Sequence, residues 1–402
     1  MRILASYFNH YRDFSLALWL NIVAVFVNAA GVMMSFFVAL YLVNVEHFSV
    51  MQMAWVFAIG GVGGIVGSYI GGWCADRFNH VRICQISLLF VALQNVLIPF
   101  THVYGVIMLL IFLSNLFTFI FRPSNSLILF AHCEQSDRTR VFAFYRMAYN
   151  LGLAFAIAIG GALARINFDY FFWFTALMSV LSAGLLHYWF KILNSKSIRR
   201  EHKPDQSAWG LLLCNRAFLI LLLLFVLNYL IFCQMRAMYG LYLAHYDGLN
   251  VQVMGYVFTI NMALIVLLEV PLMSWLKVAE PIHLVVLGTL FVGAGFAILP
   301  FGSNIAVPIL SMILLTLGEI FTASPFYVLA MRYADKSCPG FFMGIFQGGM
   351  TTGIVLAPLV GGLIYPYFEG RILWFGCGVL SLLMMFGFRR LIKLQQEQVY
   401  EK

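Results

Sequence analysis

The chain has 402 residues, of which 62% are apolar and only 10% are charged, with a formal net charge of +8 at pH 7. Soluble domains have roughly 45–50% apolar and about 25% charged residues, so this composition excludes a water-soluble globular protein. A helix needs about 20 apolar residues to cross a bilayer. Twelve such stretches predict an all-α integral membrane protein, at 15–43, 51–73, 84–101, 105–131, 141–163, 170–190, 217–245, 251–275, 284–301, 306–331, 341–364 and 372–388.

The distribution of basic residues predicts the orientation of these helices. With the N-terminus inside, nineteen of the 24 Lys and Arg residues fall on the inner side and only Arg165 and Arg371 fall in outer loops. By the positive-inside rule both termini are therefore cytoplasmic. This topology accounts for the net charge, so we expect no nucleic-acid partner.

The sequence repeats itself at a spacing of 201 to 202 residues. Matching landmarks occur in the same order in both halves: Trp73 and Trp275, Pro99 and Pro300, Pro123 and Pro325, Gly160 and Gly361. We therefore predict an N-terminal six-helix half at 1–190, a cytoplasmic linker at 191–216 and a C-terminal six-helix half with a short tail at 217–402. Two parallel repeats of this kind are typical of secondary transporters, whose substrate site lies near the midplane.

The loop after the second stretch carries the most specific motif, Gly72-Trp-Cys-Ala-Asp76-Arg77-Phe-Asn79-His80-Val-Arg82. It is similar to the G-x-x-x-D-R-x-G-R-R signature of the major facilitator superfamily, and the chain most resembles the twelve-helix, drug:proton-antiporter-like branch. Asn79 replaces a glycine of the signature, and Asn also tolerates a left-handed turn. The resemblance implies a monomeric transporter in the inner membrane of a bacterium.

In this family the loop acts as a latch, and the resemblance implies a gating role for Gly72, Asp76, Arg77 and Arg82 and for Gly353 and Pro358 of the eleventh stretch. A carboxylate at residue 76 can lie near the N-terminus of that helix, where free amides favour negative charge. The alternative is that these are solvated loop charges. The fifth stretch has Ala156-Ile157 where antiporters of the family show Gly-Pro, which counts against outward antiport but not against transport.

Five charged residues fall within the predicted helices: Arg122, Arg146, Arg236, Glu269 and Glu319. A charge at the bilayer centre costs about 2.5–3.5 kcal/mol on insertion scales, so each is a functional candidate. An apolar environment lets a carboxyl group bind and release protons near neutral pH. Glu319 and Glu269 are therefore the predicted proton-coupling residues, with a structural ion pair to an arginine as the alternative.

Arg236 is the predicted contact for an anionic group, which Arg can hold bidentately. Arg122 and Arg146 are further candidates, although both can instead extend toward the cytoplasm or pair with loop carboxylates. The other predicted substrate contacts are polar residues on helices expected to line the pathway: Gln234, Asn228, Tyr239, Asn150 and Gln347.

The sequence predicts a proton-coupled transporter of small organic molecules that works by alternating access, with efflux of drug-like, amphipathic compounds as the first expectation. The alternative is transport of an anionic metabolite, such as a carboxylate siderophore or organic acid, because the arginines outnumber the glutamates within the helices. No H-E-x-x-H, G-x-S-x-G or P-loop motif occurs, so we expect neither an enzyme nor an ATP-driven pump. Seven cysteines without paired spacing predict no metal site, and no cofactor is expected.

Overall fold

A computed structural model describes residues 15–32, 38, 41–192, 208–243, 251–276, 278–302, 304–365 and 370–400. Within them the chain is helical and contains no strand. Residues 193–207, most of the predicted linker, lie outside the described residues, as do 1–14 and 401–402.

The first six long helices run in chain order from residue 16 to residue 192. They are α2 (Leu16–Ala30), α4 (Val50–Arg77), α5 (His80–Leu97), α6 (Tyr104–Ala131), α7 (Arg138–Ile166) and α8 (Phe168–Ile192). The predicted first span, 15–43, is described in part: α2 ends at Ala30, 33–37 and 39–40 lie outside the described residues, and 41–44 are helical.

Six further long helices follow. They are α10 (Arg216–Ala237), α12 (Val251–Trp275), α13 (Pro281–Ala297), α14 (Ala306–Tyr333), α15 (Pro339–Ile364) and α16 (Arg371–Tyr400), with the short α9 (Ala208–Cys214) and α11 (Tyr239–Leu243) on either side of α10. Ten of the described helices are long and apolar enough to cross a membrane, and α2 is a shorter apolar helix. Together with α7, these make twelve helices among the described residues, so the predicted all-α membrane fold is confirmed.

The internal repeat extends to the secondary structure. Pro99 lies in a 3₁₀ turn, η1 (Ile98–Phe100), that follows α5, and Pro300 lies in the equivalent turn, η3 (Leu299–Phe301), that follows α13. The helices after these turns, α6 and α14, have 28 residues each and contain Pro123 and Pro325. Proline removes a helix hydrogen bond and tends to kink a helix, so its recurrence at matching positions repeats a backbone feature.

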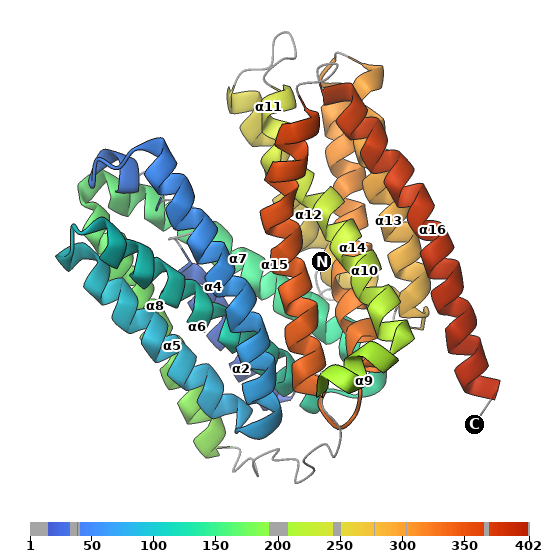
Figure 1. Cartoon of the computed structure of the whole chain (residues 1–402), viewed down its shortest axis with the longest axis horizontal. Coiled ribbons are helices and arrows are strands. Elements are labelled where there is room, and N and C mark those ends of the chain that lie inside the picture. Colours follow the sequence, from blue (N-terminus) through green and yellow to red (C-terminus); the bar gives the residue numbers. More distant parts are fainter. Residues whose placement is uncertain are drawn as a thin grey trace, which may run out of the picture. The chain divides into compact units, whose positions relative to one another are not determined.

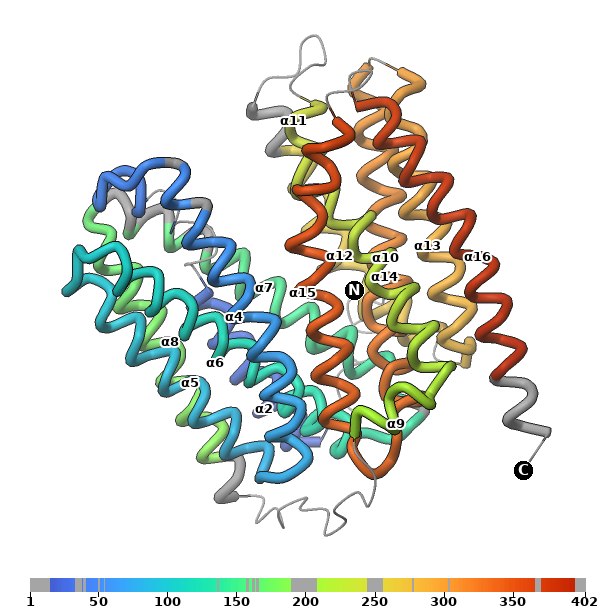
Figure 2. Tube along the Cα trace, viewed as in Figure 1, coloured from blue at the N-terminus to red at the C-terminus, as the bar shows by residue number. Residues whose placement is uncertain are grey.

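Packing divides the chain into two units, one of 1–205 with 336–348 and one of 206–335 with 349–402. In the first unit α6 packs on α4 and α5, and α8 packs on α5 and α2, as Figures 1 and 2 show. In the second unit α14 packs on α12 and α13, and α16 packs on α13 and α10. The same four pairings therefore recur in both units.

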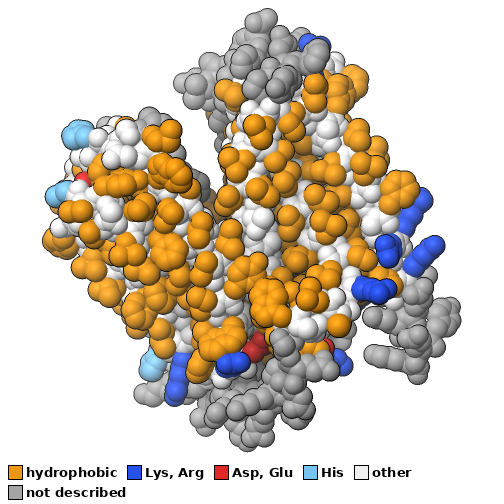
Figure 3. Space-filling view, viewed as in Figure 1, with side chains coloured by type: hydrophobic (Ala, Val, Ile, Leu, Met, Phe, Trp, Pro, Cys, Tyr) orange, Lys and Arg blue, Asp and Glu red, His pale blue; other side chains and the backbone are white. Residues whose placement is uncertain are grey.

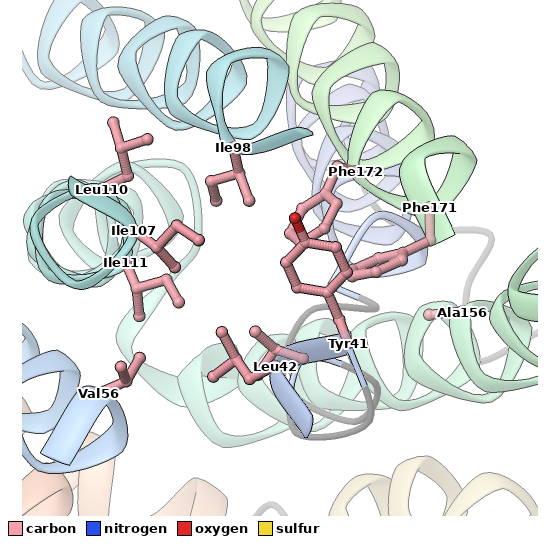
Figure 4. Packing of buried hydrophobic residues seen from close by; sticks show 11 residues of the cluster. Tyr41, Leu42, Val56, Ile98, Ile107, Leu110, Ile111, Ala156, Phe171 and Phe172 are labelled. Atoms are coloured by element: carbon pink, nitrogen blue, oxygen red, sulfur yellow. The ribbon is translucent and has the colours of Figure 1, made fainter. Parts of the chain in front are cut away.

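The core of the first unit includes an apolar cluster around Tyr41. Its ring meets Phe172 edge to face, with ring centroids 4.8 Å apart, and lies beside Phe171 in Figure 4. Ile98 from η1 and Ile107 from α6 complete this cluster and are fully buried. Figure 3 shows hydrophobic side chains spread over much of the visible surface of each unit, as expected of surfaces that face lipid.

The structure corrects three specific expectations from the sequence. The predicted helix 217–245 is wrong, because α10 ends at Ala237 and Met238 separates it from α11. The last helix continues to Tyr400, twelve residues past the predicted 388, since an apolar window detects only the segment in the bilayer while polar residues such as Gln and Glu are also good helix formers. Asn79 is not in a left-handed turn: its backbone is extended and its side chain caps α5 by accepting from the amides of Val81 and Arg82.

Candidate functional site

The first candidate site lies at the end of α4, within the first unit. The Asp76 carboxylate accepts a hydrogen bond from the backbone amide of Gly340 at one oxygen and from that of Phe341 at the other, each over 2.6 Å. Both amides belong to the first turn of α15, where backbone N–H groups have no partner within the helix. The negative charge therefore occupies the positive end of a helix dipole.

Three glycines let the two helices approach closely enough for this contact. A Cβ atom on Gly72 would lie 2.5 Å from the carbonyl oxygen of Gly340, and one on Gly344 would lie 2.5 Å from that of Ser68. A Cβ on Gly340 would lie 2.7 Å from the Asp76 carboxylate. The backbones of α4 and the start of α15 are thus in direct contact, and any side chain at these glycines would separate them.

Gly340, Gly344 and Ser68 were not among the sequence candidates. The signal that could have identified two of them is the spacing Gly340-x-x-x-Gly344-x-x-x-Gly348, which places small residues on one helix face. The next glycine along α15, Gly349, packs against a different helix. A Cβ atom on Gly349 would meet Leu222 and Val226 of α10, in the second unit. The continuous helix α15 therefore packs its first half with α4 and its second half with α10.

The other predicted gating residues surround this contact or lie further along α15. The Arg77 guanidinium lies over the Trp73 ring, 4.2 Å from its centroid, and makes a cation–π contact with it. Arg82 is exposed. Gly353 and Pro358 belong to the half of α15 in the second unit, where a Cβ on Gly353 would lie 3.2 Å from the Tyr229 side chain.

The second candidate site is centred on Glu319 in the second unit. Glu319 is the fourteenth of the 28 residues of α14 and is partly exposed. The amide nitrogen of Asn261 in α12 lies 3.2 Å from Glu319 Oε2 and 3.0 Å from Thr316 Oγ1. Both Glu319 and Arg236 lie near enough to Cys233 and Tyr229 of α10 to act on them electrostatically. The structure thus brings Glu319 and Arg236 into one neighbourhood.

The position of Arg236 differs from the one expected. In a continuous helix 217–245 it would lie deep in the membrane, but in the structure it is exposed in the last turn of α10. Unpaired carbonyl groups at a helix C-terminus favour a cation, so the helix end itself helps to accommodate this charge.

Glu269 has a different environment from Glu319. It is fully buried between α12 and α14, and Ser324 donates a hydrogen bond to its Oε1 over 3.1 Å. A buried carboxyl group needs such donors, because an unsatisfied one would cost several kcal/mol, roughly, on transfer from water.

Three predicted substrate contacts in α10 and α11 use their polar atoms to bind other helices. Gln234 donates to the carbonyl of Ala357 over 2.8 Å, and Asn228 donates to Thr289 over 3.0 Å. The Tyr239 hydroxyl donates to the carbonyl of Pro308 over 2.9 Å. All three are buried, as is Gln347 of α15. Their participation in substrate binding stays a prediction.

The remaining candidates belong to the first unit. The Arg122 guanidinium lies over the Phe119 ring, 4.2 Å from its centroid, and Arg146 and Asn150 are partly exposed on α7. Nearby in sequence, Asn125 accepts a hydrogen bond from Asn21 of α2 over 3.0 Å. Among the described residues, no three His, Cys, Asp or Glu side chains come together as a metal site would require.

These features define a class of protein: a polytopic membrane transporter built from two six-helix repeats, with charged side chains inside the helical units and a carboxylate bonded to a helix N-terminus. A family model described as Major Facilitator Superfamily matches residues 18–348. The chain therefore belongs to the major facilitator superfamily, and it is a transporter rather than an enzyme.

Relatives of similar length support the assignment. The chain is 23% identical over 392 residues to an uncharacterized MFS-type transporter, YttB, of Bacillus subtilis, covering 96% of this chain and 95% of that protein. It is 23% identical over 373 residues to the multidrug resistance protein MdtH of Yersinia pestis, covering 89% of this chain and 90% of that protein.

Solved structures show the same fold at low sequence identity. A bacterial homologue of the iron transporter ferroportin, in an outward-facing state, has a TM-score of 0.79 and 14% identity and covers 94% of this chain and all of that chain. The human organic anion transporter MFSD10 (TETRAN) has a TM-score of 0.73 and 12% identity and covers 92% of this chain and 98% of that chain.

Proposed function

We propose that this protein is a proton-coupled secondary transporter that exports small, amphipathic organic compounds by alternating access. The observation that carries the proposal is Glu319, a partly exposed carboxyl group at the midpoint of a membrane-spanning helix. A charge at this depth has a high free-energy cost unless it has a function or a partner. A carboxyl group avoids this cost while it holds a proton, because it is then neutral. The uptake and release of that proton is also a function that explains why the residue is present.

Glu319 is the better of the two candidate proton carriers. A proton carrier must exchange its proton with water, and the side chain of Glu319 is partly exposed whereas Glu269 is fully buried. The aromatic residues Tyr229 and Tyr327 act electrostatically within the same neighbourhood and offer flat, apolar surfaces to an organic substrate. The multidrug resistance relative, MdtH, agrees with an amphipathic substrate.

Gating in this proposal uses the contact of Asp76 with the first turn of α15. Because α15 is one continuous helix whose two halves belong to different packing units, making or breaking the Asp76 contact at its start is a means of coupling the units. The charge distribution along the chain supports cytoplasmic termini, the bacterial relatives support an inner-membrane location, and the presence of both repeats in one chain supports a monomer.

The alternative is an anionic metabolite as substrate, and one observation favours it: Arg236 is exposed beside the same neighbourhood. A guanidinium group binds a carboxylate bidentately. In this alternative Arg236 binds the substrate, and Glu319 accepts the proton that accompanies it.

Proteoliposomes with an internal pH-sensitive dye test both versions. Amphipathic cations and polycarboxylates are added separately to vesicles containing wild type, Glu319→Gln or Arg236→Ala. If the protein exports amphipathic compounds, the cations should drive proton movement, which Glu319→Gln should abolish and Arg236→Ala should leave largely intact. If polycarboxylates drive proton movement instead, and Arg236→Ala abolishes it, the anionic-metabolite alternative replaces the efflux proposal. Arg389→Ala, an exposed arginine on α16, is the matched control.

A further inference from the structure

The side-chain amide of Asn261 donates hydrogen bonds to two acceptors on one helix. Its nitrogen lies 3.0 Å from Thr316 Oγ1 and 3.2 Å from Glu319 Oε2, so its two hydrogens serve the two residues. Asn261 is 1% exposed and belongs to α12, while both acceptors lie on α14, three residues apart and therefore on one helix face.

The Thr316 hydroxyl fixes the orientation of this amide. Thr316 Oγ1 donates its own hydrogen to the carbonyl of Met312 over 2.6 Å, so it can face Asn261 only as an acceptor. The nitrogen end of the Asn261 amide must then point toward α14, which also directs its second hydrogen toward Glu319. The chain Met312, Thr316, Asn261, Glu319 thus has a defined direction of donation.

A donor aimed at a carboxylate favours its ionised form. Among the described residues, the charged or titratable groups that act in this neighbourhood include Arg236, Cys233 and Tyr229 of α10 and Tyr327 of α14. Arg236, in the last turn of α10 with an exposed side chain, also favours the ionised carboxylate. Asn261 differs from it in being a fully buried, neutral donor whose nitrogen lies within hydrogen-bond distance of the carboxylate.

We propose that Asn261 is the positioning residue for the proton-coupling carboxyl group: its amide holds the Glu319 carboxylate in one orientation. This inference rests on the proposed role of Glu319. It makes Asn261 and Thr316 part of the coupling mechanism although neither needs to contact substrate.

The test is the pH dependence of substrate-driven proton movement in proteoliposomes, with Asn261→Leu and Thr316→Val compared with wild type. Leu has nearly the shape of Asn but cannot donate, so the carboxyl group should keep its proton to higher pH. We expect the pH of half-maximal proton movement to rise by about 0.5 to 1 unit, the size expected for one hydrogen bond. Thr316→Val should raise this midpoint by less, because Asn261 keeps its donor and loses only the acceptor that orients its amide group.

Asn95→Leu is the matched control. Asn95 is equally buried, and its amide donates to the carbonyl of Val91 within α5, remote in sequence from the carboxylates. A second readout that does not depend on transport is the carboxyl C=O stretch in infrared difference spectra, whose pH midpoint should move with Asn261→Leu and disappear with Glu319→Gln.

The outcomes separate this inference from the proposed function. If wild type moves no protons with any compound, or if Glu319→Gln leaves proton movement intact, the proposed function fails. If Glu319→Gln abolishes proton movement but Asn261→Leu leaves both pH midpoints where they were, the proposed function stands and the positioning role of Asn261 is overturned. A reduced rate at an unchanged midpoint also overturns it, because that is the effect of a packing defect alone.

Discussion

The carboxylate of Asp76 accepts a hydrogen bond from the backbone amide of Gly340 over 2.6 Å, although the two residues are 264 positions apart in the chain. With the second bond from Phe341, it attaches the end of α4 to the start of α15. A carboxylate bound to backbone amides makes a stronger bond than a neutral pair, worth about 1.5–3 kcal/mol. Two such bonds are enough to bias a conformational equilibrium.

Asp76→Asn should release the start of α15. The substituted amide retains one acceptor oxygen and no charge, so it can replace one bond at most. Cys338, two residues before Gly340, is only 2% exposed. In a protein whose other six cysteines are replaced by serine, we expect Asp76→Asn to increase the maleimide labelling rate of Cys338 about tenfold, the factor given by loss of one such bond.

Asp137→Asn is the control for that experiment, because Asp137 precedes α7, pairs with Arg140 in its first turn at 3.6 Å and is remote in sequence from α15. Equal labelling of Cys338 in wild type and Asp76→Asn would show that the carboxylate does not hold this helix end.

Gly344→Ala should destabilise the protein. Its Cβ atom would lie 2.5 Å from the carbonyl oxygen of Ser68 and 2.8 Å from Gly72 Cα, and these backbone atoms cannot move aside as a flexible side chain can. Overpacking of this kind costs about 1–3 kcal/mol, which should lower the thermal unfolding midpoint in detergent. Gly184→Ala in α8 is the control, because no heavy atom lies within 4 Å of its added Cβ. A midpoint for Gly344→Ala equal to that of Gly184→Ala would contradict close packing of α4 and α15.

The sequence was sufficient to predict the repeated architecture because its signals are local. Pro99 and Pro300 mark matching turns, and runs of apolar residues mark helices whatever their neighbours are. The close packing of Gly344 on Ser68 depends on which helices are neighbours, and the pattern of small or apolar residues in one helix does not identify the helix that it packs against. The end of α10 at Ala237 was missed because no Gly or Pro marks it.

Glu46 provides a prediction at the opposite end of the first unit. Its side chain is 3% exposed, it accepts a hydrogen bond from the Tyr41 hydroxyl over 2.5 Å, and it pairs with His102 at 3.1 Å. His102 is 77% exposed, so its contribution is screened by water and should be below about 1 kcal/mol. Tyr41→Phe removes a donor from a buried carboxyl group and should cost about 1–3 kcal/mol.

Thermal unfolding in detergent should therefore show a clearly larger loss for Tyr41→Phe than for His102→Ala. A larger loss for His102→Ala would mean that the exposed ion pair, and not the buried hydroxyl, stabilises this end of the unit.

Two native cysteines test the predicted orientation and the effect of burial together. Burial raises the pKa of Cys133 to about 11, partly offset by Arg138, while Cys214 in α9 is exposed. Only the thiolate reacts readily, so at pH 7 Cys133 should be labelled slowly, and its rate should rise about tenfold per pH unit up to pH 11. Cys214 should be labelled readily, and by an impermeant maleimide only when the cytoplasmic face is open to it.

Labelling of Cys214 in intact cells by the impermeant reagent would reverse the predicted topology. A Cys133 rate equal to that of Cys214 at pH 7 would show that the pKa of the Cys133 thiol is not raised.

The candidate site was predictable in its residue types but not in its pairings. Glu269 and Glu319 stand out in the sequence for the same reason, a carboxyl group within an apolar helix, and sequence gives no means to rank them. Their difference is tertiary: Ser324 lies against one and Asn261 against the other, and only Glu319 is partly exposed.

Glu269→Gln should consequently retain proton movement, in contrast to Glu319→Gln. Gln preserves the shape of the side chain and an oxygen that can accept from Ser324, so packing between α12 and α14 should survive. Because this carboxyl group is fully buried, we do not expect it to carry the transported proton. Ser324→Ala should instead affect stability by about 1–3 kcal/mol, since it removes a donor from a buried carboxyl group. Proteoliposome assays of the two Gln variants, with thermal unfolding of Ser324→Ala, measure these effects. Loss of proton movement in Glu269→Gln, at normal expression and stability, would transfer the coupling role from Glu319 to Glu269.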